Sequence, residues 1–383
     1  MVKMINASTR EIDDPEEAVR EILAQLDLEK RRLRNAVGLI ACHADYLESG
    51  VVKALCEALP FDVAGCTTLG SSVNGEYGME LLSFSVLTSE EERFSTAFSP
   101  EISSGGVEAV QALYRSAGTE KAALTLAYAP MHSAMGGPAI LEALDRSSGG
   151  TPIFGALASY HASSLSNSRV IYNGEAYKDG LALVLIRGNI KPCFFITTIP
   201  ENKIQKQAAV ITKSEGCVVQ KVNETTPLEY FDSLGLLSGE KLSSGKIMPL
   251  IVKYNDGTEA VARGIYSLTP EGYMICGGEM PEQATFAVGT LDYNGVIETA
   301  ESTVARTLEA VPKDEGSLLM FPCFSRGMVL GPNADDELRK VVSLAGGKPY
   351  HLCYAGGEIC PVSNDEGAFL NRFHNFTFTI CAL

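Results

Sequence analysis

The C-terminal residues alternate strictly between apolar and polar side chains. Over residues 373–381, one face would carry a histidine and three large apolar residues, and the other would carry amide, hydroxyl and thiol groups. This period of two predicts a β-strand with two unlike faces. We expect the strand to be buried, because unpaired strand edges favour aggregation. Its polar face is then expected to line a cavity, and that face comprises Asn375, Thr377, Thr379 and Cys381.

Upstream, apolar residues recur at helical spacing and then in short runs. Asp14 and Pro15 are typical of a helix start, and the apolar period predicts a helix to about residue 35. Strand-like and helix-like segments then alternate, and Asn173-Gly174 predicts the turn of a hairpin over 169–186. This half ends in consecutive strands, which favours a mixed sheet. The predicted strands are 37–42, 62–64, 81–87, 122–129, 152–158 and 194–199, and the predicted helices are 47–59, 106–117 and one after 136–138.

The second half follows a less regular stretch over 200–226. Thr226 is suited to cap a helix over 228–234. The further predicted elements are strands near 248–254, 259–268 and 272–277, a long helix over 297–311, a strand at 318–324, a helix at 334–344 and a strand at 350–354. We therefore predict a mixed, α+β-like α/β protein with two domains, each a mixed β-sheet flanked by helices. The predicted divisions are an N-terminal helix at 1–35 and domains at 36–226 and 227–383.

Charge and composition exclude several classes of partner. The 383 residues include 31 Lys and Arg against 47 Asp and Glu, a net charge of −16. Nucleic acids and anionic membranes repel such a protein, so we expect neither as a partner. The start of the chain lacks the apolar core of a signal peptide, and no window resembles a membrane span. We therefore expect a cytoplasmic protein whose ten cysteines are reduced thiols, without a zinc or other metal site.

The chain lacks the familiar catalytic signatures. It has no Gly-x-Ser-x-Gly elbow, no phosphate loop ending in Gly-Lys-Ser/Thr and no His-Glu-x-x-His. The five histidines are scattered, and Cys42 and His43 would point to opposite faces of a strand. We therefore expect a protein that is not an enzyme and needs no cofactor.

Polar residues do occur where the chain leaves predicted strands. Cys323 and Arg326 follow one strand, Glu358 follows a Gly-Gly turn after another, and Asn375 opens the last. Such positions commonly hold ligands in α/β proteins. Arg326 could bind the carboxylate of an amino acid and Glu358 its ammonium group. Alternatively, Arg326 and Glu358 could pair with each other and stiffen two loops, and the residue types alone do not decide between the two.

These segments resemble the FIST (F-box and intracellular signal transduction) family from about residue 36 onward. Its C-terminal pattern, Cys-x-x-Arg, then Gly-Glu followed by Pro, then His-Asn-x-Thr, is matched by residues 323–326, 357–361 and 374–377. In the N-terminal half, 65–70 resembles the first glycine turn of the family and Phe154-Gly155 the second. The chain departs from the family at Ala156, where relatives usually carry glycine. It also has Ser159-Tyr160-His161 instead of an acidic residue, and the acidic residue after the first turn is displaced to Glu76.

The resemblance implies a sensory module that binds small molecules, with amino acids proposed as ligands. The signal would pass to a separate histidine kinase, cyclic-dinucleotide enzyme or chemoreceptor, since the chain has no segment long enough for an output domain outside the two halves. The N-terminal helix could contact that partner or pack on the first domain. The ligand-binding residues that the resemblance and the strand ends together predict are Arg326, Glu358, Asn375, Cys323, Gly357, Thr377, Cys66, Thr67 and Gly155.

Three alternatives remain open. Cys66 or Cys323 could be the nucleophile of an enzyme that acts on small amides or esters, although spacing ties no histidine base to either. Some FIST members resemble haem-binding gas sensors, which would require a histidine as axial ligand. The chain could also be a scaffold for a protein partner.

Overall fold

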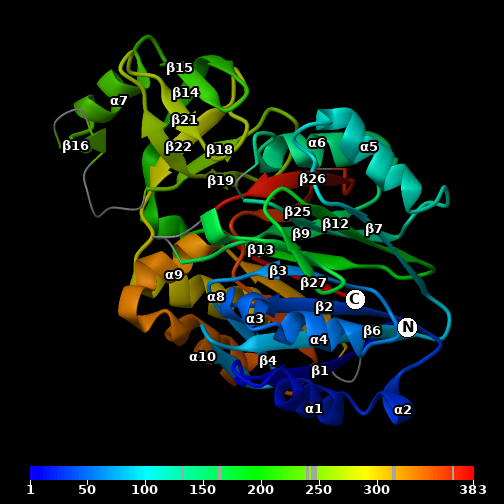
Figure 1. Cartoon of the computed structure of the whole chain (residues 1–383). Coiled ribbons are helices and arrows are strands. Elements are labelled where there is room, and N and C mark those ends of the chain that lie inside the picture. The colour runs from blue at the N-terminus through cyan, green and yellow to red at the C-terminus, as the bar shows by residue number, and fades with distance from the viewer. Residues whose placement is uncertain (132, 162–165, 239–240, 243–247, 313–315, 365) are drawn as a thin grey trace.

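The computed structural model describes residues 1–131, 133–161, 166–238, 241–242, 248–312, 316–364 and 366–383. Helices and strands alternate along most of this chain, so the predicted mixed α/β class is confirmed. Figure 1 shows a large body and a smaller lobe of strands that projects from it at the upper left. The large body is built from three units of one design, and the lobe is inserted into the third unit.

Each unit has the element order β-α-β-α-β, then a hairpin, then a last strand. The first unit contains β1 (Lys3–Thr9), α1 (Pro15–Leu26), α2 (Leu28–Arg31), β2 (Asn35–Cys42), α3 (Asp45–Glu48), α4 (Val51–Glu57), β3 (Val63–Thr67), β4 (Ser71–Val73), β5 (Glu76–Gly78) and β6 (Leu82–Ser89). The second contains β7 (Arg93–Ser99), α5 (Gly106–Ser116), β8 (Leu124–Ala129), α6 (Gly137–Ser148), β9 (Ile153–Leu157), β10 (Val170–Tyr172), β11 (Glu175–Tyr177) and β12 (Leu181–Arg187).

The third unit repeats this order around the insertion. It contains β13 (Cys193–Thr197), α8 (Tyr293–Ala310), β23 (Leu318–Pro322), α9 (Phe324–Leu330), α10 (Asp335–Leu344), β24 (Tyr350–Cys353), β25 (Glu358–Ser363), β26 (Phe369–His374) and β27 (Phe378–Ala382). Two short 3-10 helices lie at Glu201–Lys203 and Gly331–Asn333. The third unit therefore begins before the predicted boundary at 226/227, and its first strand lies far along the chain from its second.

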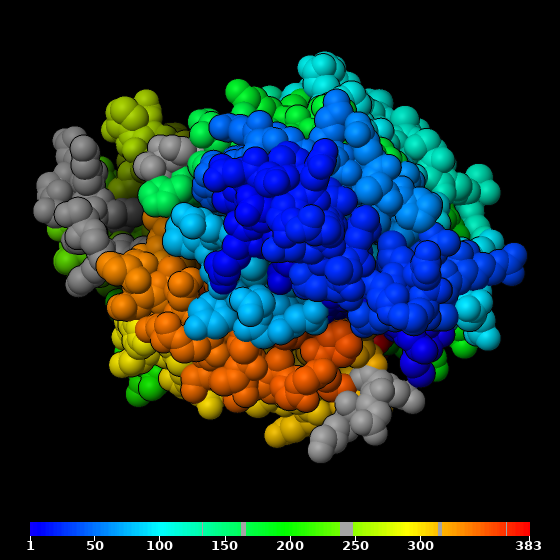
Figure 2. Space-filling model, turned by 60° about the horizontal axis from the view of Figure 1, so that its bottom comes forward, coloured from blue at the N-terminus to red at the C-terminus, as the bar shows by residue number. Residues whose placement is uncertain are grey.

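The units exchange their hairpins around a ring. The sheet orders are β1-β6-β2-β3-β10-β11, β7-β12-β8-β9-β25-β26 and β13-β27-β23-β24-β4-β5. In each sheet one central pair is parallel (β2–β3, β8–β9 and β23–β24), and a hairpin from another unit completes the edge. Strands from the two predicted halves thus share sheets. Figure 2 shows N-terminal residues, in blue, against residues of the third unit, in orange.

The three sheets enclose a central apolar core. Phe321 of β23 stacks on Phe154 of β9, with ring centroids 4.9 Å apart, and meets the edge of Tyr128 of β8 at 6.3 Å. All three side chains are buried, and residues of β1, β2 and β3 complete the same cluster. Helices cover the outer face of each sheet: α1 and α4 the first, α5 and α6 the second, and α8 and α10 the third.

In its described residues, the smaller lobe is a seven-stranded antiparallel sheet with one α-helix. Its strands are ordered β19-β18-β22-β14-β15-β21-β20. They span β14 (Ile204–Glu215), β15 (Val218–Val222), β18 (Leu250–Lys253), β19 (Val261–Arg263), β20 (Ile265–Leu268), β21 (Met274–Cys276) and β22 (Thr285–Gly289), with α7 (Pro227–Ser233) and the short pair β16 (Leu237–Ser238) and β17 (Lys241–Leu242). The predicted boundary at 226/227 lies inside this lobe, where Thr226 and Glu229 form a capping box and confirm the predicted helix start.

The structure divides the predicted helix 47–59 into α3 and α4 and the predicted strand 259–268 into β19 and β20, and it differs further at the two ends of the chain. The predicted helix to residue 35 ends at Leu26, because Asp27 adopts a left-handed conformation (φ 45°), and β1 precedes it where no strand was predicted. The predicted terminal strand is broken after His374. Phe376 has φ 60°, so β26 and β27 belong to different sheets and the alternation over 373–381 spans a bend.

Gly65 allows β3 to approach β2 closely. A Cβ at this position would overlap the carbonyl oxygen of Ile40. We expect Gly65→Ala to lower the free energy of unfolding by about 3 kcal/mol, because backbone cannot move aside as a side chain can. Chemical denaturation measures this change. Gly70→Ala is the matched control, since a Cβ there would lie 3.5 Å from its nearest neighbours. Equal effects of the two substitutions would contradict the expectation.

Candidate functional site

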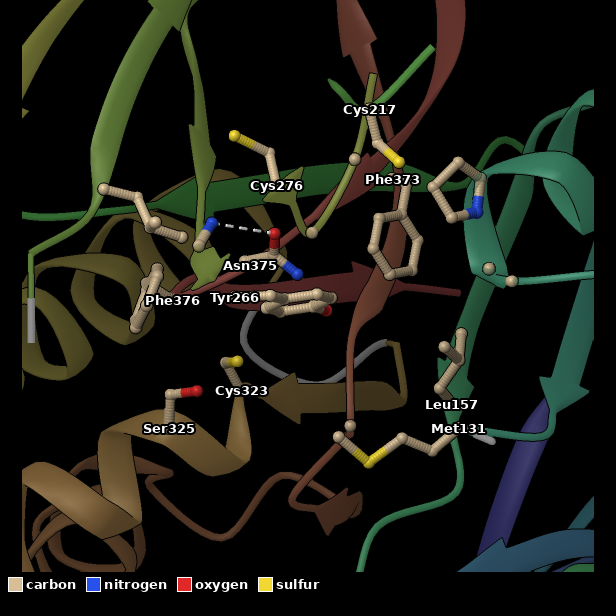
Figure 3. A pocket seen from close by; sticks show the side chains of 18 of the residues that line it. Met131, Leu157, Cys217, Tyr266, Cys276, Cys323, Ser325, Phe373, Asn375 and Phe376 are labelled. Carbon is tan, nitrogen blue, oxygen red and sulfur yellow. Dashed lines mark hydrogen bonds between the residues drawn. The ribbon is translucent and has the colours of Figure 1, made fainter. Parts of the chain in front are cut away.

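A cavity of about 730 Å³ lies between the smaller lobe and the large body (Figure 3). Its wall is mainly apolar and rich in glycine, and its polar side chains are neutral. The lining residues are Met131, Gly136, Gly137, Pro138, Leu157, Cys217, Met248, Gly264, Ile265, Tyr266, Ile275, Cys276, Gly277, Gly278, Cys323, Phe324, Ser325, Met328, Gly356, Phe373, Asn375 and Phe376. This volume suits a small organic molecule.

The topology explains the position of the cavity. Its floor is formed by loops that follow the carboxyl ends of β8, β9, β23 and β24, which are the parallel strands of the second and third units. In open α/β sheets such ends are the usual place for ligands. The lobe closes the opposite side mainly with residues of β20 and β21 and with the glycines that adjoin these strands.

Asn375 occupies the bend between β26 and β27. Its Oδ1 atom accepts a hydrogen bond from the backbone N–H of Gly264, at 3.1 Å, so a residue of the lobe fixes the orientation of this side chain of the large body. Figure 3 shows the amide nitrogen on the cavity side. Among the described residues this nitrogen has no hydrogen-bond partner, although the residue is only 5% exposed. Asn375 therefore offers an oriented donor at the cavity wall.

Tyr266 and Gly277 shape the space beside Asn375. The Tyr266 ring lies across the middle of the cavity (Figure 3), and the residue is 64% exposed, so it also forms the rim. A Cβ at Gly277 would lie 2.6 Å from Oδ1 of Asn375 and 2.8 Å from the Tyr266 hydroxyl. Only glycine leaves room for both groups at this point.

Cys323 and Glu358 lie together at the floor of the cavity. Cys323 lines the cavity, whereas Glu358 is fully buried behind it. Thr377 donates to Oε2 of Glu358 from its hydroxyl at 2.6 Å and from its backbone N–H at 3.4 Å. Oε1 has no hydrogen-bond partner among the described residues. Burial raises the pKa of Glu358 to about 8, and burial together with the nearby Glu358 raises the pKa of the Cys323 thiol well above its usual value.

Arg326 does not line the cavity. Its guanidinium is fully buried and pairs with Glu337 of α10, with Nη2 2.6 Å and Nε 2.8 Å from Oε1. It also donates to the carbonyl of Val296 at 2.8 Å and to the hydroxyl of Thr299 at 3.0 Å. The structure therefore places Arg326 neither as the predicted carboxylate clamp nor in the alternative ion pair with Glu358. The positive charge of Arg326 lowers the pKa of Glu358, but the effect is small beside that of burial, which raises it.

Thr67 and Cys66 lie at the junction of the three units, outside the cavity lining. The Thr67 hydroxyl donates to the carbonyl of Ser159 at 3.0 Å, and Thr68 and Ser159 both donate to the carbonyl of Tyr354. These bonds tie together the chain segments that follow β3, β9 and β24. Cys66 packs in the central core.

The predicted glycines allow close packing. A Cβ at Gly155 would overlap the carbonyl oxygen of Ala127, and one at Gly357 would overlap the ring of Phe373. Thr377 supports Glu358. Of the nine predicted site residues, Cys323 and Asn375 line the cavity and the other seven do not.

Several lining residues were not predicted. Tyr266 and Cys276 come from the lobe, where the sequence shows no motif. The Gly277-Gly278 pair at the end of a predicted strand was the one signal that another group approaches the backbone closely there. Glu337, the partner of Arg326, also escaped prediction. It lies next to Leu338 and four residues before Val341, so its place on the apolar face of the predicted helix was a usable signal.

No described histidine lines the cavity, and His132 lies outside the described residues. Burial lowers the pKa of His351 to about 4 and that of His374 to about 3, so both are neutral packing residues at pH 7. In the described part of the chain, no group of three or more His, Cys, Asp or Glu side chains is arranged to hold a metal ion. The described lining residues thus include no histidine that could serve as the axial ligand of the haem alternative.

Comparison with protein families identifies both halves of the chain. The family model of the FIST N domain matches residues 36–225, and that of the FIST C domain matches residues 228–361. The chain belongs to the FIST family. FIST domains are sensory domains of signal transduction. No curated protein matches this FIST chain. Among its described helices, none is both long and apolar enough to cross a membrane.

Proposed function

We propose that this FIST protein is a cytoplasmic sensor that binds an uncharged small molecule in the cavity between lobe and body. The observation that carries the proposal is the Asn375 amide nitrogen, an oriented donor that faces the cavity without a partner among the described residues. A ligand carbonyl would replace solvent as the acceptor of this oriented donor within a mainly apolar wall. The remaining wall favours an apolar or aromatic body for the ligand.

The charge of the wall argues against an amino acid. None of the described lining residues is charged, so neither an α-carboxylate nor an ammonium group would find a counter-ion. Moving such ions out of water without partners is costly. We therefore propose a cyclic or aromatic amide, imide or ketone as the ligand class in place of the predicted amino acid.

Output through a separate protein is the second part of the proposal. FIST domains are sensory domains of signal transduction, which supports a partner that carries the output. A histidine kinase, a cyclic-dinucleotide enzyme or a chemoreceptor would suit a FIST sensor. A reducing compartment fits the ten cysteines, each of which is described and is a free thiol.

A thermal-shift screen tests the ligand. Uncharged cyclic amides and ketones should raise the melting temperature, because a ligand that binds only the folded state stabilises it, and the amino acids should not. Asn375→Asp is the matched variant, because it keeps the oxygen that accepts from Gly264 and replaces only the donor. We expect it to weaken binding about tenfold or more. Unchanged binding to this variant, or shifts produced by amino acids alone, would contradict the proposal.

A further inference from the structure

Three thiols line the cavity, and one of them lies beside a carboxyl group. Cys217 and Cys276 belong to the lobe, and Cys323 lies between β23 and α9. Figure 3 shows the Cys323 sulfur beneath the Tyr266 ring. Cys323 is 1% exposed, so a reagent can reach it only through the cavity.

Glu358 carries an unpaired carboxyl oxygen in the buried layer behind Cys323. Its Oε2 atom is occupied by Thr377, and its Oε1 atom is buried without a partner among the described residues. The backbone N–H of Cys323 donates to the carbonyl of Thr377 at 2.9 Å, and the hydroxyl of the same Thr377 holds Glu358, so the thiol and the carboxyl group flank one residue. A carboxyl group that stabilised the fold alone would be expected to use both oxygens. The free oxygen beside a cavity-lining thiol indicates a reactive pair.

We propose that Cys323 captures α,β-unsaturated carbonyl compounds covalently, with Glu358 as the proton acceptor. This inference rests on the proposed function, since the electrophile must first occupy the cavity. The Asn375 amide nitrogen is the donor available to the carbonyl oxygen of such a ligand. The sensor would then respond to electrophiles by forming an adduct.

The reaction is a conjugate addition and needs no oxidant or leaving group. The Cys323 sulfur forms a bond to the β-carbon of the ligand, and the electron pair of the C=C double bond moves onto the carbonyl oxygen as an enolate. The thiol proton passes to the Glu358 carboxylate and then to the enolate, which restores the carboxylate. Hydrogen bonding to the enolate oxygen by Asn375 would stabilise the developing charge.

The surroundings of the pair define its pH dependence. Glu358 is faced by Cys323, Tyr266, Cys360 and Arg326, and it pairs across the strands with His374, which is neutral. Only the ionised carboxylate accepts a proton, so reactivity should rise as Glu358 ionises around pH 8. An unassisted thiol with a strongly raised pKa would instead continue to gain reactivity at higher pH.

Site-resolved labelling of the full chain with N-ethylmaleimide tests the proposal. Peptide mass mapping after short exposure gives the rate at each cysteine. Cys276 is the internal control, because it lines the same cavity, is 2% exposed and has a pKa raised to about 12 by burial. We expect Cys323 to react faster than Cys276 by about tenfold or more. Glu358→Gln should remove that advantage and leave the Cys276 rate unchanged.

The outcomes separate this inference from the proposed function. A Cys323 rate no greater than that of Cys276, or a rate unchanged by Glu358→Gln, overturns the capture. If Glu358→Gln fails to fold, the pH profile of the natural chain decides, and a Cys323 rate that does not level off above about pH 8 overturns it. Non-electrophilic ketones that bind through Asn375 while Cys323 stays inert would overturn the capture alone and leave the proposed function standing.

Discussion

Arg326→Met is expected to lower the free energy of unfolding by about 4 kcal/mol, because it leaves the Glu337 carboxylate buried without its partner. Both side chains of the pair are fully buried. Methionine keeps much of the apolar volume of arginine, so the loss would reflect charge more than packing. Urea denaturation at neutral pH, monitored by circular dichroism, measures the change.

Two further variants isolate the cause. Adding Glu337→Gln to Arg326→Met removes the stranded charge and keeps an acceptor for the Tyr354 hydroxyl, which donates to Glu337 at 2.7 Å. The double variant should therefore be more stable than Arg326→Met alone. Arg339→Met is the surface control, since Arg339 pairs with Asp336 and its side chain is 61% exposed. Its cost should be about 0.5 kcal/mol or less.

The same variants distinguish a structural role from ligand binding. If the role of Arg326 is to form a structural ion pair with Glu337, the folded fraction of Arg326→Met should bind uncharged ligands with unchanged affinity. If Arg326→Met instead kept normal stability and no longer bound the ligand, Arg326 would have the ligand-binding role that the sequence predicted.

Phe321→Ala should cost a similar amount, about 4 kcal/mol, because it opens a hole where the three sheets meet. Phe321 is fully buried and contacts aromatic rings from the second unit. The loss would loosen two units at once, so we expect one cooperative transition at lower denaturant rather than separate transitions for the units. Denaturation followed by both circular dichroism and intrinsic tyrosine fluorescence tests this.

Phe369→Ala is the control for the core substitution. Phe369 is 46% exposed and touches Phe194 at the edge of its sheet. Its removal should cost about 1 kcal/mol or less. If both phenylalanine variants lost equal stability, the central cluster would not be the main connection between the sheets.

Local features were predictable from the sequence because their causes are local. The helix starts at Asp14 and Thr226 depend on side chains that cap neighbouring N–H groups. The turn at Asn173-Gly174 depends on two residues that tolerate positive φ, at 47° and 89°. The end of α1 at Asp27 was missed because no glycine marks its left-handed turn.

The triplicated architecture was not predictable in the same way. The three units share an element order but no motif that marks a repeat, and their exchanged hairpins join strands far apart in the sequence. Alternation cannot assign a strand to a sheet, so β26 and β27 looked continuous although Phe376 turns the chain between them.

Site residues were predictable where they directly follow a strand whose end faces the lobe. Asn375 and Cys323 satisfy that condition, and both line the cavity. Arg326 follows the same strand as Cys323, but α9 turns it toward Glu337, a long-range partner that residue spacing did not disclose. The contribution of Tyr266 depends on how the lobe docks against the ring, which is a property of tertiary structure alone.

The hairpin exchange also constrains how the chain matures during synthesis. The second sheet awaits β25 and β26, and the third awaits β27, which lies between β13 and β23. Both sheets therefore expose unfinished edges until β25, β26 and β27 have been synthesised, and such edges are prone to wrong pairing. Assembly of the ring is thus a late event with high contact order, which should make it slow and dependent on chaperones.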